Sequence, residues 1–449
     1  MTAWCSSSSR STASWPSWAD AMSLNYREAL AELEARRETR MVPDLSRILR
    51  LATLLADPQL SYPSIHVTGT NGKGTAATVA AALACAHGIS AGLYTSPHLL
   101  RVTERLSVCG EDITEAEFAE EYDHLLPYLM MVDRESEERV TYFETLTVLA
   151  YLWFADKPAG LGVFEVGMGG LWDATNLVTG DVAVITPIDL DHPELGPTVT
   201  DVAREKAGII KEGKIVVVRE QLDEALTVIE DRCRDVGADL KLEFRDWDVE
   251  DRLQAVGGQA MRVRGLFGTY DDLHLPLFGE HAARNAAAAI VALEALLGHS
   301  LAGKEMRRAL ASVRWPGRME VVSRQPTLML DGAHNPAAAQ ALVAALQESF
   351  LWDRLHLVVA VSGNKDLEGI VGELAPLADI AYVAKNESER SGDAAPLATR
   401  FTNHGTDVKT FDGVASALAA ARAAADPGDL ILVTGSLYTV ADARRAIGA

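Results

Sequence analysis

The chain has 449 residues and a formal net charge of −22 at pH 7, with 48% hydrophobic and 23% charged residues. This acidic balance argues against a nucleic-acid-binding protein, which needs a basic face, and no apolar run in the sequence is long enough to cross a bilayer. The length exceeds what one hydrophobic core usually serves, so we expect two domains.

The N-terminal segment and the cysteines carry little functional signal. Residues 1–21 contain Ser and Trp without a continuous apolar stretch, so they make a poor signal peptide, and we expect a disordered tail or an over-long start before Met22. The cysteines at 5, 85, 109 and 233 show no short paired spacing. The sequence therefore predicts neither a zinc site nor a disulfide framework, and free thiols fit a reducing, cytoplasmic interior.

Strands and helices are predicted to alternate along the chain. Apolar residues at helical spacing indicate two short helices between Asn25 and Ala56, before a first strand at 65–67. The first part continues with strands at 91–94, 161–166, 181–186 and 214–218, and with helices at 76–87, 115–130, 142–154, 281–297 and 303–313. After a Pro-Gly linker at 315–318, a smaller set has strands at 327–330, 355–361, 380–384 and 430–433.

This alternation is typical of parallel β-α-β units. We therefore expect an α/β fold in which a larger domain with a mostly parallel sheet precedes a smaller Rossmann-like α/β domain. Ligands of such sheets bind at the carboxyl ends of the strands. A glycine-rich loop, Glu165 and the run from Asp189 to His192 each follow a predicted strand. These separated segments should converge on one edge of the sheet.

The glycine-rich loop is the most informative motif. It reads Gly69-Thr70-Asn71-Gly72-Lys73-Gly74-Thr75 and opens into an alanine-rich helix. The glycines allow a tight turn with N–H groups pointing inward, Lys73 can reach the outer phosphates of a nucleotide, and the Thr75 hydroxyl can bind Mg²⁺. A glycine-rich turn without a ligand is the plain alternative, and Gly74 separates the Lys from the Thr that usually follows it directly. The concentration of Gly, Asn, Lys and Thr in one turn favours a nucleoside triphosphate.

The other candidates are weaker when each is taken alone. Glu165 at a strand end fits a Mg²⁺ ligand, but a solvated or helix-capping carboxylate also explains it. His192 fits a loop histidine, and Lys206 fits a solvated charge on a helix. The run from Asp331 to Pro336 places an acid, an imidazole and an amide after another strand, and its Asn335 fits a helix cap equally well.

Taken together, the motifs resemble those of the folylpolyglutamate synthases, from about Met22 to the C-terminus. They stand in the order found in that family, which is more specific than any one of them. The motifs are the phosphate loop, Thr95-Ser96-Pro97-His98-Leu99, Phe143-Glu144, Glu165 to Gly170 with Asp173-Ala174-Thr175-Asn176, Asp191-His192, Glu205-Lys206-Ala207-Gly208, His281 with Asn285, Trp315-Pro316-Gly317-Arg318 and Asp331 to Pro336.

The resemblance implies an ATP-dependent amide ligase related to the Mur ligases, which adds L-glutamate to the γ-carboxylate of a folate. Many bacterial members also join dihydropteroate to the first glutamate. By resemblance we expect a Mur-ligase-like P-loop domain at 22–313 that binds ATP and folate, and a glutamate-ligase α/β domain at 314–449. The implied partners are small molecules, namely ATP, L-glutamate and folate or dihydropteroate, with no nucleic acid and no membrane. Family members are commonly monomers, so we expect a cytoplasmic monomer.

The resemblance also assigns roles within the nucleotide and folate sites. Lys73 and the amides of 69–75 would hold the β- and γ-phosphates, and Asn285 and Asp331 would contact the nucleotide. Arg318 and His334 would reach the γ-phosphate from the second domain. The folate site would include the loop formed by Ser96, Pro97, His98 and Leu99.

Two Mg²⁺ ions belong to the implied site. Thr75 and Glu165 would hold one ion, and His192 would bind the second. Lys206 matches a family lysine that CO₂ carbamylates, which converts a cation into an oxygen-donor anion suited to Mg²⁺. K⁺ is a further ion that fits the resemblance.

The implied mechanism follows from the low reactivity of a carboxylate. Its oxygen attacks the γ-phosphorus of ATP to give an acyl phosphate, and the glutamate amine then attacks the activated carbonyl. Such phosphoryl transfer depends on positioning and charge neutralisation. Because the groups come from both domains, we expect the domains to close around ATP and to exclude water from the acyl phosphate.

The chain departs from the family pattern at several positions. Leu171 and Trp172 stand where the family more often has an Arg, Asp189 occupies a usual glycine, and the segment after His192 is one residue shorter. The segment 386–390 also differs, so the residues that hold the incoming glutamate are unassigned. The role of Gly435-Ser436-Leu437-Tyr438, which resembles a family motif, is open.

Two other functions are compatible with a phosphate loop. A Mur-type cell-wall ligase shares the chemistry, but it usually carries a uridine-nucleotide-binding domain before the phosphate loop, where this chain has only 68 residues. A switch module that hydrolyses ATP slowly would not need Glu165, His192 and Lys206, nor a second domain with Arg318 and His334. Glutamate-dependent release of ADP separates a ligase from such a module.

Overall fold

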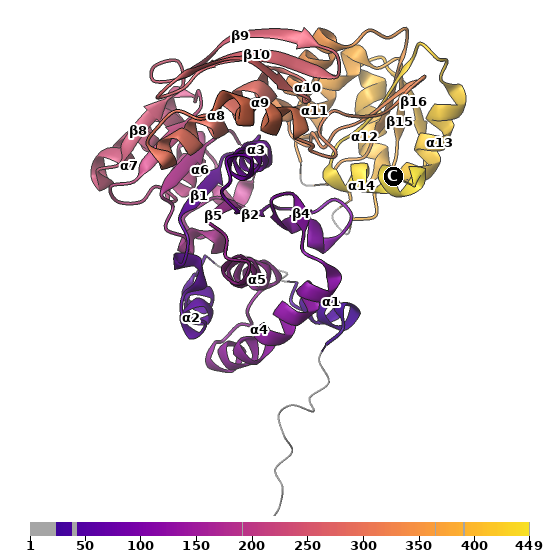
Figure 1. Ribbon diagram of the computed structural model, residues 1–449. Coiled ribbons are helices and arrows are strands. Elements are labelled where there is room, and N and C mark those ends of the chain that lie inside the picture. The colour runs from indigo at the N-terminus through magenta and orange to yellow at the C-terminus, as the bar shows by residue number, and fades with distance from the viewer. Residues whose placement is uncertain (1–23, 38–42, 191, 364, 389–390, 449) are drawn as a thin grey trace, which may run out of the picture.

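The computed structural model describes residues 24–37, 43–190, 192–363, 365–388 and 391–448. They form a larger lobe around an eight-stranded sheet and a smaller lobe around a six-stranded sheet (Figure 1). The predicted α/β fold class is confirmed. Within the described ranges, no helix combines the length and the apolar character needed to cross a bilayer.

The large sheet has the strand order β4-β3-β2-β5-β1-β6-β7-β8. The pairs from β2 to β8 are parallel, whereas β3 and β4 add an antiparallel edge next to β2. The strands are β1 Ser64–Thr68, β2 Ala91–Tyr94, β3 Leu106–Val108, β4 Glu111–Asp112, β5 Leu161–Glu165, β6 Val182–Ile185, β7 Ile215–Val218 and β8 Asp239–Leu242. Because β1 is a central strand, the loop that follows it lies in the middle of the carboxyl edge.

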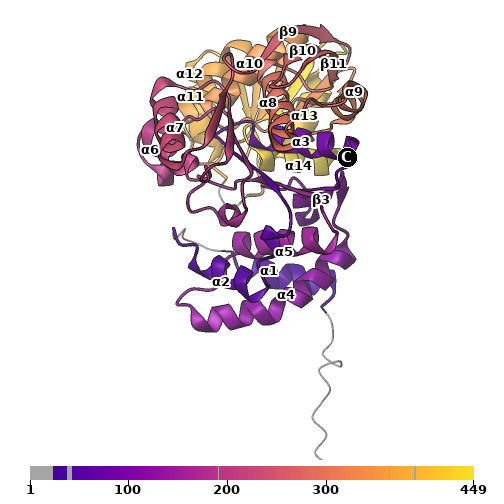
Figure 2. The same cartoon turned by 60° about the vertical axis from the view of Figure 1, so that its left-hand side comes forward.

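Helices cover both faces of this sheet, as Figures 1 and 2 show. One face packs on α3 and α8 through a core rich in Ala and Val, and the other packs on α5 and α4 through a core rich in Tyr and Phe. The helices of this lobe are α1 Tyr26–Glu34, α2 Ser46–Leu54, α3 Lys73–Ala86, α4 Glu115–Glu135, α5 Tyr142–Asp156, α6 Val199–Ala207, α7 Asp223–Val236, α8 Glu280–Leu297 and α9 Gly303–Ser312.

A three-stranded antiparallel sheet lies over α8 and was absent from the sequence-based prediction. It consists of β9 Asp248–Ala255, β10 Gly258–Arg264 and β11 Thr269–Leu275. Only one face of this sheet is covered, so β9 is built mainly of half-buried and exposed residues. Its polar sequence therefore lacks the apolar run that marked the central strands.

The smaller lobe has the strand order β12-β13-β17-β14-β15-β16, in which only β12 and β13 pair antiparallel. Its strands are β12 Glu320–Arg324, β13 Thr327–Leu330, β14 Leu355–Val359, β15 Ile380–Val383, β16 Asp407–Thr410 and β17 Leu430–Thr434. Its helices are α10 Pro336–Ser349, α11 Leu367–Leu374, α12 Ala394–Asn403, α13 Val414–Ala424 and α14 Leu437–Ile447. Two apolar cores, one on each face of the sheet, account for these packing contacts.

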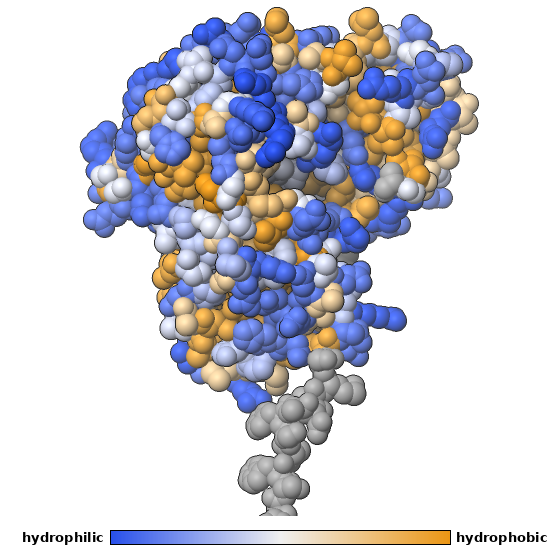
Figure 3. Space-filling model, in the orientation of Figure 1, coloured by the Kyte–Doolittle hydropathy of each residue, from blue (hydrophilic) through white to orange (hydrophobic). Residues whose placement is uncertain are grey.

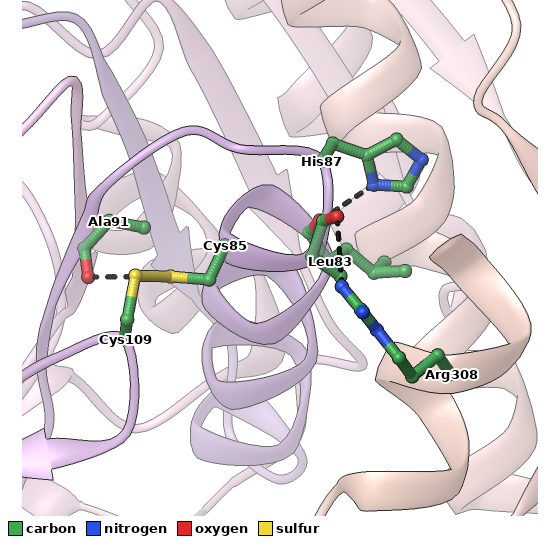
Figure 4. The surroundings of a disulfide bond; sticks show 7 residues. Leu83, Cys85, His87, Ala91, Cys109 and Arg308 are labelled. Carbon is green, nitrogen blue, oxygen red and sulfur yellow. Dashed lines mark hydrogen bonds between the residues drawn. A yellow bond between two sulfur atoms is a disulfide. The ribbon is translucent and has the colours of Figure 1, made fainter.

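The prediction of unpaired cysteines was wrong for Cys85 and Cys109. They form a disulfide with a Cα–Cα distance of 5.5 Å, which joins the last turn of α3 to the turn after β3 (Figure 4). Cys233 is free and buried, whereas Cys5 lies outside the described residues. The 24-residue separation gives no pairing signal, because the two cysteines meet only once β2 has placed β3 beside α3.

The surface is largely hydrophilic on the side that Figure 3 shows. Figure 3 shows hydrophilic residues over much of one face of both lobes, with smaller hydrophobic patches between them. Large apolar side chains such as Leu351 and Val256 are exposed at separate positions. Single exposed apolar residues of this kind are normal on globular proteins.

Candidate active site

The phosphate loop connects β1 to α3 and is pressed against its neighbours. Gly69 and Gly72 have φ values of +144° and +89°. A Cβ at Gly69 would lie 1.9 Å from Oγ1 of Thr186, and one at Gly72 would lie 2.3 Å from Nδ2 of Asn285. Glycine is therefore required at both positions, by backbone conformation and by space.

Lys73 begins α3 and folds back over the loop. Its Nζ donates hydrogen bonds to the carbonyl oxygens of Gly69 and Thr70, at 3.0 and 3.1 Å. The ammonium thus lies beside the N-terminal end of α3, which itself carries partial positive charge. This arrangement concentrates positive potential where an anionic phosphate is expected.

Thr70 ties the loop to the segment after β6. Its hydroxyl donates to the carbonyl oxygen of Asp189 at 2.8 Å and accepts from the Asp189 N–H at 2.9 Å. The pocket formed here is lined by parts of the phosphate loop, the loops after β5 and β6, and α6. These residues are Gly69, Thr70, Lys73, Gly167, Met168, Asp189, His192, Leu195, Val202 and Lys206. The separated segments therefore meet, as parallel strand order led us to expect.

Lys206 is buried on α6, so the alternative of a solvated lysine was wrong. Only 3% of the residue is exposed, and Nζ donates to the carbonyl oxygen of Gly69 at 2.8 Å. Its neighbour Glu205 accepts the N–H of Leu171 through the backbone, which holds the end of α6 against the loop after β5. The amine of Lys206 thus faces the phosphate loop.

Glu165 ends β5 with its carboxylate buried, which excludes a solvated role. It is 5% exposed and accepts the Ser96 N–H at 3.0 Å. Burial raises the pKa of the Glu165 carboxyl, while the nearby charges of Lys73 and Arg318 act in the opposite direction. A Cβ at Gly74 would lie 3.3 Å from Oε2, so this oxygen faces the first turn of α3.

His192 lies in the loop after β6, and Thr75 lies in the first turn of α3. The His192 ring follows β6, is 37% exposed and lies with Nδ1 4.0 Å from a Glu194 carboxylate oxygen. Thr75 is half-buried in the first turn of α3. Asp191, which the sequence placed beside His192, lies outside the described residues.

The two lobes touch through a pair of side-chain amides. Asn71 in the phosphate loop and Asn335 exchange two hydrogen bonds of 3.1 Å. Asn335 also accepts the Ala338 N–H at 2.8 Å and caps α10, as its alternative role predicted. The residue therefore serves both as a helix cap and as a contact between lobes.

Asp331, Arg318 and His334 surround the turn after β13. The buried Asp331 carboxylate accepts the N–H of Met319 at 2.9 Å and of Ala333 at 2.8 Å. Burial raises the pKa of Asp331, and the Arg318 charge opposes that rise. His334 Nδ1 lies 3.0 Å from the carbonyl oxygen two residues before it. Asp331 thus holds together the backbone that carries Arg318 and His334.

Asn285 on α8 belongs to a buried ionic network that the sequence did not predict. Arg219, directly after β7, donates to Oδ1 of Asn285 at 2.8 Å and pairs with Glu243. Arg284 also donates to Glu243, at 2.6 Å. An Arg-Glu pair after an apolar strand was the only sequence signal for this network, and it does not reveal the partners.

The loop at 96–99 is fixed from several sides. Arg105 donates to His98 Nδ1 at 2.9 Å, and burial together with the Arg105 charge lowers the pKa of His98 to about 3. Glu104 accepts the Leu99 N–H at 2.8 Å. Leu99 packs against an apolar core of the smaller lobe, so the loop lies between the lobes.

Trp315 lies beside the phosphate loop, whereas sequence reasoning named it only as part of a linker and of a family motif, with no role of its own. A Cβ at Gly74 would lie 2.5 Å from the Trp315 ring, so the indole covers the start of α3. This contact also explains why glycine separates Lys73 from Thr75. The Trp-Pro-Gly-Arg run was the available signal, but a linker tryptophan does not show what it covers.

The departures from the family pattern fall in different environments. Leu171 and Trp172 are 39% and 48% exposed. Asn386 is buried, and its Nδ2 donates to the hydroxyls of Ser436 and Thr439 at 3.1 and 3.2 Å. The two segments of the smaller lobe whose roles were open are therefore joined to each other.

Comparison with known proteins places both lobes. Residues 67–293 match the Mur ligase middle domain, and residues 317–437 match the glutamate ligase domain of Mur ligases. The chain is 39% identical to the dihydrofolate synthase/folylpolyglutamate synthase of Mycobacterium tuberculosis, over 92% of this chain and 91% of the relative. It is 32% identical to the folylpolyglutamate synthase of Lacticaseibacillus casei, over 94% and 99%.

Solved structures agree with these matches. The folylpolyglutamate synthase of Mycobacterium tuberculosis in complex with ADP superposes with a TM-score of 0.91 at 38% identity, over 94% of this chain and 98% of the other. FolC of Escherichia coli in complex with DHPP and ADP superposes with a TM-score of 0.84 at 32% identity, over 95% and 98%.

Proposed function

The chain belongs to the folylpolyglutamate synthase and dihydrofolate synthase family, and we propose that it joins L-glutamate to the γ-carboxylate of a folate with ATP as the energy source. The observation that carries this proposal is the pocket in which Lys73, His192 and Lys206 meet at the carboxyl edge of the large sheet. Because several relatives bear both names, the proposal includes joining dihydropteroate to the first glutamate.

The proposed site is formed by two domains, a P-loop domain at 22–313 that binds ATP and folate and a glutamate-ligase domain at 314–449. The match to the middle domain ends at 293, and the match to the glutamate ligase domain begins at 317. The sheets of the two lobes share no strand. Both observations support a domain boundary between these residues. Arg318 and His334 then belong to the second domain. The contact between Asn71 and Asn335 supports a catalytic site that uses both domains.

ATP binds with its β- and γ-phosphates in the loop 69–75. The inward turn at Gly69 and Gly72 and the position of Lys73 over the loop support this placement. The adenine lies toward Asn285, which touches Gly72. Asp331 reaches the nucleotide from the second domain, where its carboxylate already orders the turn that carries Arg318.

Two Mg²⁺ ions complete the site, and the residues present fit them. The buried Glu165 carboxylate faces the first turn of α3, which contains Thr75, and the two side chains would give one ion two oxygen donors. His192 and a carbamate on Lys206 hold the second ion. When bound, the ions neutralise charge that develops on the phosphate oxygens. K⁺ is part of the proposal, and assays in KCl and NaCl at equal ionic strength test it.

Carbamylation of Lys206 gains support from its burial against the phosphate loop. An unmodified ammonium would put a cation where metal ligands are required, whereas a carbamate supplies two oxygens there. Protein equilibrated with ¹³CO₂ should show a carbamate carbonyl signal by NMR, and Lys206→Ala should lack it. An identical signal in both proteins would exclude this part of the proposal.

The chemistry proceeds in two steps. A folate carboxylate oxygen attacks the γ-phosphorus while the bond to the ADP oxygen breaks, and Lys73, Arg318 and His334 balance the charge on the transferred group. The glutamate nitrogen then attacks the acyl carbon, loses a proton and expels inorganic phosphate. Closure of the two domains keeps water from the acyl phosphate.

The folate lies against the loop formed by 96–99. This loop packs between the lobes, and its hydrogen bonds with Arg105 and Glu104 hold it in place. Its surface is therefore fixed before the substrate binds. We propose further that the chain acts as a monomer in the cytoplasm. Free thiols do not support that location, because Cys85 and Cys109 form a disulfide. The nature of the substrates is what supports it.

The test is purified protein with ATP, Mg²⁺ and L-glutamate, offered dihydropteroate in one reaction and tetrahydrofolate in the other. We expect products heavier by one or more glutamyl residues, with ADP release that requires glutamate. Lys73→Ala should abolish product, and Lys304→Ala, which removes an exposed lysine on α9, should not. ADP release that ignores glutamate and yields no amide would contradict the ligase and favour a switch module.

A further inference from the structure

A second group of potential metal ligands lies where the end of α5 meets α4. Glu121 and His124 belong to α4, and Asp156 is the last residue of α5. Each offers one ligand atom, and these atoms all lie within 4.8 Å of one another. In the part of the chain that the structure describes, this is the only group of three or more His, Cys, Asp or Glu side chains with that spacing.

The group is separate from the proposed catalytic site. Helix α5 has 15 residues, so at about 1.5 Å per residue its ends lie roughly 20 Å apart. Its first turn carries Phe143, whose ring lies against Gly167 of the pocket, whereas Asp156 ends the helix. Figures 1 and 2 both show α4 and α5 in the helical layer on the far side of the sheet from α8.

Helix geometry presents two of the ligands together. Glu121 and His124 are three residues apart, which places them on one face of α4. The His124 ring packs edge-on against Tyr128, with centroids 6.1 Å apart, so the ring has a defined neighbour on its own helix. Asp156 and His124 are exposed, so an ion from solution can reach the group.

The Glu121 carboxylate is buried among other acids, with Asp156 within hydrogen-bonding reach. The residue is 8% exposed, and its Oε2 has no hydrogen-bond partner among the described residues. Asp156, Glu120 and Glu117 are all negative neighbours, and the nearby ammonium of Lys157 forms its ion pair with Glu117. Burial of one carboxylate of the group makes a bound cation more favourable there than on a fully exposed cluster.

We propose that Glu121, His124 and Asp156 bind one divalent transition-metal ion of the Zn²⁺ type. An imidazole nitrogen with two carboxylate oxygens suits Zn²⁺ or Co²⁺ better than Ca²⁺ or Mg²⁺, most of whose ligands are oxygen atoms. A solvent molecule completes four ligands on the exposed side. The ion replaces the repulsion between the two carboxylates with attraction and links α4 to the end of α5.

Co²⁺ is the probe, because its visible absorption reports the ligands. The full-length chain carries Cys5→Ser, so that the thiol in the N-terminal segment cannot contribute, and excess Mg²⁺ and ADP occupy the nucleotide site. The variants are His124→Ala, Glu121→Gln and Asp156→Asn. His299→Ala removes an exposed histidine after α8 and serves as the matched control.

We expect the parent protein and His299→Ala to bind one more equivalent of Co²⁺ than His124→Ala, with an absorption band that His124→Ala lacks. Glu121→Gln and Asp156→Asn should bind Co²⁺ at least about tenfold more weakly. Zn²⁺ should raise the melting temperature of the parent protein but not of His124→Ala. Equal Co²⁺ stoichiometry in all variants would overturn the proposal. Asp156 is exposed, so Asp156→Asn should fold and test the site even if the buried substitution Glu121→Gln prevents folding.

Discussion

Asn71 and Asn335 exchange a pair of 3.1 Å hydrogen bonds between the phosphate loop and the first turn of the α10 helix in the other lobe. Asn335 uses the same Oδ1 to cap that helix. Stability of the smaller lobe and contact with the nucleotide loop therefore depend on one side chain, and substitutions can separate the two roles.

Asn335→Ser should keep the cap and lose the contact between lobes. Serine is a good N-cap, so the free energy of unfolding should change little, but its hydroxyl is too short to reach Asn71. Asn335→Ala should lose both and cost about 1 kcal/mol of stability. Urea unfolding and steady-state turnover on the same proteins check this. If Asn335→Ser has normal turnover, the amide pair is not required for catalysis.

Arg318→Ala should lower turnover more than it weakens ATP binding. Its charge acts on Glu165 and Asp331, so it lies between the lobes and balances charge that grows during phosphoryl transfer. We expect kcat to fall by about 100-fold or more, with a smaller change in ATP affinity measured by calorimetry. Arg314→Ala, at an exposed position just before the linker, is the control. Unchanged turnover in Arg318→Ala would contradict a site built from both lobes.

The buried His98 should make the folded protein sensitive to mild acid. Its pKa is lowered to about 3 in the folded state, while an unfolded histidine titrates near 6.5. Between these values the unfolded chain binds the extra proton, so His98 contributes stability above pH 6.5 that is lost as the pH falls toward 3. The slope reaches about 1.4 kcal/mol per pH unit at most.

His98→Gln keeps a hydrogen-bond acceptor for Arg105 but does not titrate in this range. Its free energy of unfolding should therefore fall less steeply between pH 7 and 5 than that of the parent protein. Denaturant unfolding at several pH values gives both slopes. Equal slopes would show that His98 is not neutral and buried in the folded protein. His66 and His281, with pKa values lowered to about 3 and 4, contribute equally to the pH dependence of stability in the parent protein and in His98→Gln.

Removing the Cys85–Cys109 link should destabilise the larger lobe. A cross-link across 24 residues restricts the unfolded chain, so its loss should cost about 3 kcal/mol in the chain-entropy account. The double variant Cys85→Ser with Cys109→Ser should melt earlier than the parent protein under oxidising conditions. Dithiothreitol should lower the melting temperature of the parent alone. A parent protein insensitive to reductant would mean that the two thiols are unpaired in solution.

Elements with strong apolar runs were predictable from the sequence. Strands at 91–94 and 327–330 were predicted with the bounds of β2 and β13, and most helices differ by a few residues at their ends. Helix α3 begins at Lys73 rather than Ala76, because the left-handed Gly72 starts it earlier. The sheet formed by β9, β10 and β11 was missed, since strands with one covered face carry many polar residues.

Only those residues of the candidate site that directly follow a strand could be placed from the sequence. Parallel topology told us that Glu165, His192 and the phosphate loop would converge, because their strands share one edge. Burial of Lys206 and the partnership of Asn285 with Arg219 depend on how helices pack on that edge, which residue spacing does not encode. The link between Asn71 and Asn335 depends on the relative placement of two lobes, and no local pattern carries it.

Helix α5 runs from Tyr142 to Asp156, and the ring of Phe143 in its first turn leaves room only for glycine at 167. A shift of this helix along its axis would push the aromatic ring into the floor of the pocket. A genetic screen for altered substrate use should therefore recover changes in the α4–α5 layer as well as at the cleft. Such distant variants would show that the position of α5 along its axis sets the shape of the pocket.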